Sequence, residues 1–182
     1  MKPVSRGYDK LKFAVEKFGI DIKEKVCADL GSSTGGFVQV LLEKGALKVY
    51  SVDNGRNRLH FMLKDDKRVE VIDEVNAMYV TLPEKVDIIT IDVGWTPQKK
   101  IIPNAIKNLK NDGKIISLVK PQYEAYPEWL DKGTLKEENL GNVIDKVKKD
   151  LDGEATVLGI AKSPIKGEKG KNVEFFVLLE KN

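Results

Sequence analysis

The stretch DLGSSTGGFVQV, residues 29–40, decides the fold of this chain. The apolar run VCADLG predicts a buried strand, and GGFVQVLLEKG predicts a helix that ends at Gly45. Three glycines fall within six residues between them, and a backbone so poor in side chains can approach a ligand closely. The stretch is neither G-x-G-x-x-G nor a P-loop, which would end in GK[ST]. It therefore indicates a ligand-binding turn, with a tight turn that holds no ligand as the alternative.

The rest of the chain alternates strand-like and helical segments. Strands are predicted at 26–31, 47–54, 68–73, 86–93, 114–121, 154–163 and 172–181, and helices at 5–19, 35–45, 58–63, 99–113 and 134–151. Alternation of this kind predicts an α/β protein whose mostly parallel sheet has helices on both faces. The last two strands have no helix between them, so the seventh strand should run antiparallel. This layout resembles the Rossmann-like sheet of class I methyltransferases, although the alternation alone suits many doubly wound proteins.

Length and composition favour one globular domain. The chain has 182 residues, of which 41% are hydrophobic and 32% charged. No apolar run is long enough to span a bilayer and no secretory signal is visible, so we expect a cytoplasmic protein without a membrane partner. Cys27 is the only cysteine and His60 the only histidine. We therefore expect a buried free thiol, no disulfide and no metal site. The net charge of +3 permits a nucleic-acid partner.

The predicted ligand is a nucleoside cofactor. Asp53 ends the second strand about twenty residues after the glycine turn, where a carboxylate can accept both hydroxyls of a ribose. Because no second phosphate-binding signal appears, S-adenosylmethionine is favoured over NAD. Asn76, after the third strand, could contact an adenine edge or simply face solvent. The residues expected to bind the cofactor are Asp29, Gly31, Ser32, Ser33, Thr34, Gly35, Gly36, Phe37, Asp53, Asn76 and Asp92.

Charged residues end three further strands at the same rim. Asp92 closes the fourth strand, Lys120 closes the fifth, and Glu174 begins the antiparallel seventh. Ligands of such sheets bind beyond the carboxyl ends of the parallel strands, so the three side chains should face one site. The alternative is that each is an ordinary solvated charge.

Five motifs in register then resemble one family. SRGYDKL, DLGSSTGGF, VDIITIDV, SLVKPQYEA and SPIKGEKGKNVEFF are similar to motifs of the TlyA (hemolysin A) family, which belongs with FtsJ/RrmJ-type 2′-O-ribose RNA methyltransferases. The likeness spans nearly the whole chain. It implies methyl transfer from S-adenosylmethionine to RNA, with ribosomal RNA as the expected substrate. It also implies a catalytic set of Lys10, Asp92, Lys120 and Glu174.

The chain departs from the family's pattern in three places. The family usually carries an N-terminal S4-like RNA-binding domain, and this chain begins where the catalytic domain should, so we expect residues 1–182 to form a single FtsJ-like domain. A separate RNA-binding partner protein could supply the missing part. Tyr8 replaces the second glycine of the family's SRGG, and VGWTPQ replaces VSFIS. Trp95, within that segment, could stack on a nucleotide or pack in the protein.

The expected reaction needs a group that handles a ribose 2′-hydroxyl, which is a poor acid. Lys120 would accept its proton if Lys10 and burial lower the lysine pKa, or would orient it as an ammonium if Asp92 and Glu174 raise that pKa. The loop PIKGEKGK offers Lys166, Lys169 and Lys171 to an RNA backbone. Two alternatives stay open, namely a small-molecule methyltransferase and an RNA-binding module that has lost catalysis.

Overall fold

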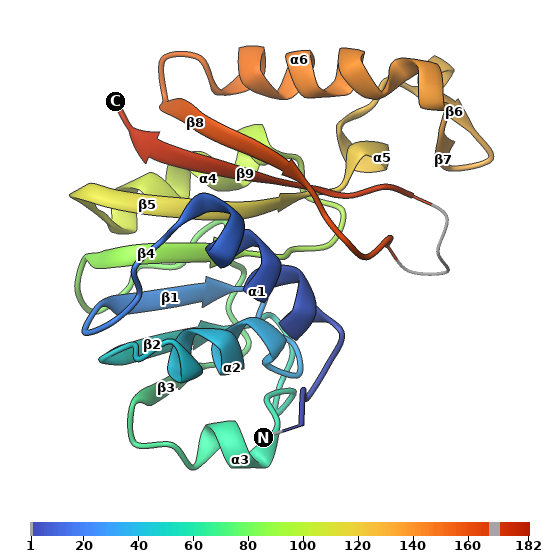
Figure 1. Ribbon diagram of the computed structural model, residues 1–182. Coiled ribbons are helices and arrows are strands. Elements are labelled where there is room, and N and C mark those ends of the chain that lie inside the picture. The colour runs from blue at the N-terminus through green and yellow to red at the C-terminus, as the bar shows by residue number, and fades with distance from the viewer. Residues whose placement is uncertain (1, 168–171) are drawn as a thin grey trace.

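The computed structural model describes residues 2–167 and 172–182 (Figure 1). Its main sheet has seven strands in the order β3-β2-β1-β4-β5-β9-β8. The strands are β1 (Val26–Leu30), β2 (Lys48–Val52), β3 (Val69–Ile72), β4 (Val86–Ile91), β5 (Leu109–Val119), β8 (Ala155–Lys162) and β9 (Phe175–Lys181). Strands β1 to β5 pair in parallel, and β9 is antiparallel to both β5 and β8. The predicted mostly parallel sheet with an antiparallel last strand is confirmed.

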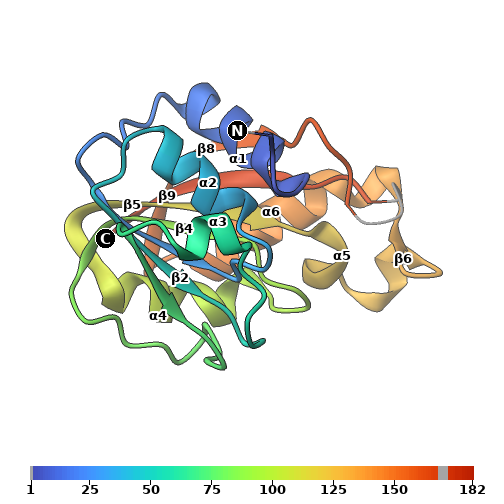
Figure 2. The ribbon, with the colours of Figure 1, turned by 90° about the horizontal axis from the view of Figure 1, so that it is seen from below.

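Helices cover both faces of this sheet (Figures 1 and 2). One face carries α1 (Gly7–Phe18) and α2 (Gly36–Glu43), and the other carries α4 (Gln98–Asn108) and α6 (Leu140–Leu151). Two single-turn helices, α3 (Phe61–Lys64) and α5 (Pro121–Glu124), follow β2 and β5. The carboxyl ends of the parallel strands lie together on the right of Figure 1, which is the rim where ligands of such sheets bind.

The two faces of the sheet bury separate layers of apolar side chains. In β1, Ala28 and Leu30 belong to the layer under α4 and α6, whereas Cys27 belongs to the layer under α1 and α2. Successive strand residues point to opposite faces, which produces this division. Cys27 is fully buried, and burial raises the pKa of its thiol to about 12. It is the inert buried thiol that the sequence predicts.

Two predicted helix boundaries are wrong. The helix predicted at 99–113 ends at Asn108, because Leu109 pairs with Val86 and lengthens β5 by several residues. The helix predicted at 134–151 begins only at Leu140. Before it, Lys132 and Gly133 have positive φ, and this turn makes a hairpin.

The hairpin belongs to an irregular segment between α5 and α6. It consists of a 3₁₀ turn η1 (Pro127–Trp129), the strands β6 (Leu130–Asp131) and β7 (Thr134–Leu135), and a second 3₁₀ turn η2 (Glu137–Asn139). Asn172, two residues before Glu174, accepts a hydrogen bond from the Leu135 backbone at 3.0 Å. The hairpin is therefore held beside the start of β9. Within the described part of the chain, no helix has the length and apolar character needed to cross a membrane.

Candidate functional site

The turn after β1 brings bare backbone to the carboxyl rim of the sheet. Gly31 has φ +88°, and a Cβ atom there would lie 2.6 Å from the Asp92 carbonyl oxygen. The backbone N–H groups of Gly31 and Ser32 both donate to the Val52 carbonyl, at 2.8 and 3.0 Å. Gly35, with φ +95°, is the N-cap residue of α2. Only glycine fits the Gly31 position, so the turn closely joins the ends of β1, β2 and β4.

Asp29 of β1 lies beneath the cavity and is hydrogen-bonded to residues of β4 and of the turn. It is 1% exposed, and its Oδ1 accepts a 2.7 Å hydrogen bond from the Thr90 hydroxyl. Burial raises the pKa of its carboxyl to about 7, while the Thr90 hydrogen bond opposes that rise. The Ser32 hydroxyl donates to the Asp29 carbonyl at 2.8 Å. Asp29 and Ser32 thus build the turn rather than line the space above it.

Asp53 organises the other side of the turn. Its Oδ2 accepts from the Ser33 backbone N–H at 2.8 Å, and its Oδ1 accepts from the Gly55 backbone N–H at 2.7 Å. Arg58 Nε lies 3.8 Å from Oδ1. Each carboxylate oxygen retains further acceptor capacity, since a carboxylate offers about four lone-pair positions. Asp53 can therefore fix two loops and still accept ligand hydroxyls.

A cavity of about 190 Å³ opens above these residues. Five residues expected to bind the cofactor line it, namely Gly31, Ser33, Asp53, Asn76 and Asp92. The other lining residues, which the sequence analysis did not single out, are Asn54, Arg58, Ala77, Met78, Val93, Gly94, Thr96 and Ile101. Most of these belong to loops, where no periodicity marks them.

The remaining members of the expected cofactor set do not line the cavity. Asp29, Ser32, Thr34, Gly35 and Gly36 form or support the turn. Phe37 is 3% exposed and packs with Phe176 at a ring-centroid distance of 6.1 Å. The first turn of α2 directs this ring into the core beneath α1, away from the cavity, and its contact with the cofactor stays a prediction.

Two expected catalytic residues form an ion pair at the edge of the cavity. Lys120 Nζ lies 2.6 Å from Asp92 Oδ1 and donates a 3.1 Å hydrogen bond to the Val93 carbonyl. The contact with Asp92 lies outside hydrogen-bond angles, so it is an ion pair rather than a directed hydrogen bond. Both side chains are partly open, at 18% exposed for Lys120 and 25% for Asp92. A ligand at the cavity edge can reach them.

The other two expected catalytic residues form a buried ion pair. Lys10 Nζ lies 2.5 Å from Glu174 Oε2, and the two residues are 3% and 2% exposed. Lys10 shares the buried stripe of α1 with Leu11, Ala14 and Val15. A lysine on an apolar helical stripe is a signal that could have identified Lys10 without a family resemblance.

Strand pairing places the two ion pairs side by side. Val119 of β5 pairs with Phe175 of β9. Lys120 follows Val119 and Glu174 precedes Phe175, so these two residues lie opposite each other at the end of the ladder. The sequence expectation that Asp92, Lys120 and Glu174 share one rim agrees with this geometry.

Trp95 projects from the loop that follows β4. Its side chain is 82% exposed and its φ is +54°, a conformation that costs a non-glycine residue roughly 1 kcal/mol. Its neighbours Gly94 and Thr96 line the cavity. The alternative that Trp95 packs inside the protein is wrong.

The lysine loop is described only in part. Lys166 is exposed, whereas Lys169 and Lys171 lie outside the described residues. Gly167 approaches the site closely, since a Cβ there would lie 2.8 Å from Glu174 Oε1. Lys166 is therefore near the rim in sequence and in space.

Another buried acid, Glu124, lies in α5, the short helix that follows Lys120. Glu124 is 4% exposed and accepts a 2.8 Å hydrogen bond from the backbone N–H of Gln98, the first residue of α4. Its Oε2 has no hydrogen-bond partner within the described residues. Burial raises the pKa of this carboxyl to about 7, opposed by the Gln98 bond and by Lys146. Between pH 4.5 and 7 the Glu124 carboxyl is protonated in the folded protein and ionised in the unfolded chain. Its contribution to the free energy of unfolding therefore decreases as the pH rises.

The sheet order, the glycine turn after β1 and the acidic residue after β2 together define a class I methyltransferase fold. Residues 3–181 match the model of the family described as FtsJ-like methyltransferase. The chain belongs to this family, and its relatives place it among the TlyA and hemolysin A proteins.

Three relatives illustrate the likeness. The chain is 38% identical to "Hemolysin A" of Brachyspira hyodysenteriae, over 96% of this chain and 75% of the relative. It is 39% identical to the "23S rRNA (cytidine-2'-O)-methyltransferase TlyA" of Campylobacter jejuni, over 98% of this chain and 71% of the relative. A solved structure described as "Putative hemolysin from Streptococcus thermophilus" superposes with a TM-score of 0.94 at 35% identity, covering 100% of this chain and 68% of that one.

Proposed function

We propose that this protein transfers the methyl group of S-adenosylmethionine to a ribose 2′-hydroxyl of ribosomal RNA. The observation that carries the proposal is the Asp92–Lys120 ion pair at the edge of a cavity that also contains Asp53. The Campylobacter relative, named as a 23S rRNA (cytidine-2′-O)-methyltransferase, supports ribosomal RNA as the substrate class and cytidine as the nucleotide. Such a substrate implies a cytoplasmic protein.

The residues around the cavity fit the cofactor. The Gly31 backbone has no room for a side chain and leaves the floor of the cavity open. Asp53 is 7% exposed yet lines the cavity, where it offers free acceptor positions to a ribose diol. Asn76 also lines the cavity, and its Oδ1 accepts a 2.9 Å hydrogen bond from the Met78 backbone N–H, which leaves its amide N–H groups for a ligand. Bound S-adenosylmethionine would supply an electrophilic methyl group.

We propose that Lys120 orients the acceptor hydroxyl. In its ion pair with Asp92 it is an ammonium, which can donate a hydrogen bond to the 2′ oxygen. That bond would stabilise the negative charge that develops on the oxygen as its proton passes to water, while the new O–CH₃ bond forms and the S–CH₃ bond of the cofactor breaks. Asp92 and the Val93 carbonyl hold the ammonium, and alignment of the two reactants is the main requirement of a displacement. Lys10 and Glu174 keep the neighbouring end of β9 in place.

Exposed residues at the rim fit an RNA acceptor better than a small molecule. Trp95 offers an open indole beside the cavity, and stacking on an aromatic ring is how proteins commonly hold an unpaired base. Lys166 offers a cation to the RNA backbone, together with Lys169 and Lys171 of the same loop. We propose that these residues contact the target nucleotide and its neighbours.

Replacement of Lys120 tests the proposal. Lys120→Ala should abolish transfer of tritiated methyl groups to ribosomal RNA while S-adenosylmethionine affinity stays within about twofold, because the cofactor is held by the turn and Asp53. Lys107→Ala, an exposed lysine at the end of α4, is the matched control and should transfer normally.

Two results would contradict the proposal. One is substantial transfer by Lys120→Ala on an RNA that the wild type methylates. The other is transfer that survives when the modified nucleotide carries a 2′-deoxyribose, which would make a base the acceptor.

A further inference from the structure

The segment 54–68, which links β2 to β3, concentrates the positive charge of the protein. It contains five arginines and lysines and two aspartates, and its net charge of +3 equals the formal net charge of the whole chain. The other residues together are therefore neutral. A surface that attracts polyanions should lie here more than elsewhere.

This segment is anchored to the cofactor turn. Leu59 and Leu63 are 7% and 3% exposed, and both lie against Gly35, where a Cβ would come within 2.5 Å of each side chain. The His60 backbone N–H donates to the Thr34 carbonyl at 3.3 Å. A molecule bound to α3 is therefore held at a fixed position relative to the cavity, which Arg58 of the same segment lines.

Because Leu59 and Leu63 pack into the protein, the side chains of the two residues before Leu63 point toward solvent. Phe61 is 67% exposed and Met62 is 44% exposed. The His60 and Phe61 rings stack with centroids 4.6 Å apart and planes at 28°. Single exposed apolar residues are common, but adjacent exposed Phe and Met next to a stacked imidazole form a platform that folding alone does not require.

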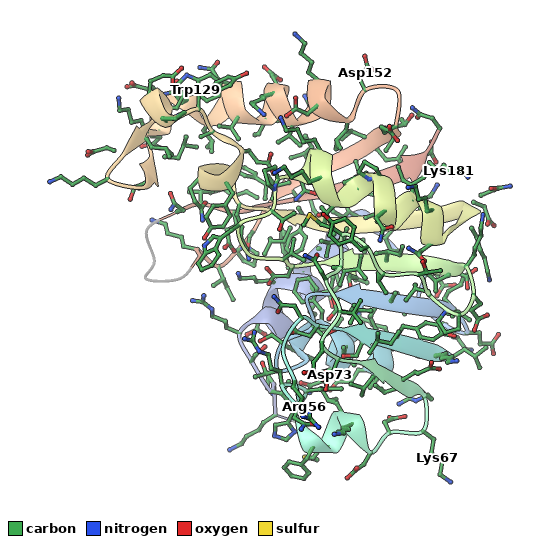
Figure 3. All side chains as sticks on the ribbon, turned by 180° about the vertical axis from the view of Figure 1, so that it is seen from behind. Arg56, Lys67, Asp73, Trp129, Asp152 and Lys181 are labelled. Carbon is green, nitrogen blue, oxygen red and sulfur yellow. The ribbon has the colours of Figure 1, made fainter. Side chains whose placement is uncertain are left out.

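Cations flank this platform. Lys64 Nζ donates to Asn57 Oδ1 at 3.0 Å, which holds its ammonium over the loop that carries Arg56. Asp73 lies close by, and its Oδ2 accepts from the Asn57 backbone N–H at 2.8 Å. Figure 3 shows Arg56 and Asp73 together near the rim, with Lys67 extending into solvent from the other end of α3.

Some of the nearby acidic groups have other partners. Asp66 forms an ion pair with Arg68 at 2.8 Å at the far end of the segment. Asp53 accepts hydrogen bonds from two backbone N–H groups beside the cavity. We define the α3 surface as Arg56, His60, Phe61, Met62 and Lys64.

We infer that the α3 surface binds single-stranded RNA that flanks the nucleotide at the cavity. Phe61 stacks on a base, and Arg56 and Lys64 bind phosphates on either side of it. An exposed ring beside cations is the chemistry that holds single-stranded nucleic acid, whereas a protein partner needs a larger apolar area. The inference rests on the proposed function, because it assumes an RNA substrate.

Binding of a fluorescein-labelled 20-nucleotide single-stranded RNA to the full chain tests the role of the ring. Phe61→Leu should weaken binding about tenfold, because stacking on an aromatic ring contributes that much or more per base. Phe61→Tyr keeps a ring and should bind like the wild type. Equal affinity of Phe61→Leu and the wild type would overturn the stacking assignment.

The salt dependence of the same binding tests the cations. Arg56→Ala combined with Lys64→Ala should flatten the slope of log affinity against log salt by about 1.4, since each phosphate contact on a single strand contributes about 0.7. Lys107→Ala combined with Lys149→Ala is the matched control, because both lysines are exposed in the last turns of α4 and α6, at the opposite rim. An equal slope in the α3 double variant and the wild type, or an equal change in the control, would overturn the inference.

Parallel assays separate this inference from the proposed function. S-adenosylmethionine affinity should be unchanged in all α3 variants, and their methyl transfer should fall with their RNA affinity. If the wild type methylates ribosomal RNA and the α3 variants bind RNA and transfer methyl groups equally well, only the α3 surface is refuted. If the wild type methylates no ribosomal RNA but the α3 variants still lose RNA affinity, the proposed function fails and the surface stands. Weaker binding to ribosomal subunits with unchanged binding to RNA would assign the surface to a protein and overturn the inference.

Discussion

Removing the amine of Lys10 should destabilise the protein far more than removing a lysine from a surface ion pair. Lys10 and Glu174 are nearly inaccessible to solvent, and their charges face each other at 2.5 Å. Lys10→Met leaves the Glu174 carboxylate buried without its cation, which typically costs about 3–5 kcal/mol. For a chain of this length each kcal/mol lowers Tm by roughly 2–4 °C, so the expected decrease is about 10 °C.

The chain contains a matched control for this variant. Lys44, the C-cap residue of α2, forms an ion pair with Glu16 of α1 at 3.2 Å, but their side chains are 39% and 54% exposed. Lys44→Met should therefore change the free energy of unfolding by less than about 1 kcal/mol. A thermal melt of both variants compares the same chemical change in buried and exposed surroundings. A smaller effect for Lys10→Met than for Lys44→Met would refute the reasoning.

A double variant separates the structural role of the pair from its proposed catalytic role. Lys10→Met combined with Glu174→Gln leaves no unpaired buried charge, and much of the lost stability should return. Methyl transfer should stay low in this double variant if the two charges contribute to the reaction. Wild-type transfer by a stable double variant would show that the pair supports only the fold.

Two further predictions concern buried carboxylates. Asp53→Asn should weaken S-adenosylmethionine binding by more than tenfold in calorimetry, because it removes a charged acceptor, whereas Asp73→Asn, after the next strand, should bind normally. Undiminished affinity would remove Asp53 from the cofactor site. Glu124→Gln keeps the acceptor for the Gln98 N–H but has no carboxyl to ionise. Because the folded-state pKa of Glu124 is raised to about 7, the wild type should lose stability relative to this variant as the pH rises from 5 to 8. In denaturant melts the difference in the free energy of unfolding should grow by up to roughly 3 kcal/mol. Exposed Glu128→Gln should show no such trend, and a parallel trend would refute burial as the cause.

The sequence predicts the sheet well because its strands are short apolar runs with clear ends. The seven strands and the antiparallel last strand all follow from local patterns. The errors fall where tertiary pairing overrides local preference. Residues 109–113 are polar and read as the end of a helix, yet Leu109 pairs with Val86 and draws them into β5. The hairpin at 130–135 depends on two residues with positive φ, of which Lys132 gives no signal in the sequence.

The residues of the candidate site also fall into a group that the sequence predicts and a group that it does not. Asp53, Asp92 and Lys120 could be predicted because each follows a parallel strand and parallel strands end at one rim. Glu174 could be predicted because the antiparallel last strand begins at that same rim. Cavity residues such as Arg58 and Met78 could not be, since loop conformation alone brings them there. Phe37 belongs to the cofactor set expected from the sequence, and the apolar stripe of α2 places its ring in the core.

The two ion pairs of the site differ in a way that bears on their roles. Asp92 and Lys120 are adjacent to the cavity and partly open, so a ligand can exchange contacts with them. Lys10 and Glu174 are closed to solvent and join residues 164 positions apart, one from the first helix and one from the start of the last strand. Because Glu174 lies opposite Lys120 at the end of the β5–β9 ladder, the buried pair fixes the strand end on which the open pair depends. The open pair therefore lies beside an end of β9 that is held by a contact between the first helix and the residue before the last strand.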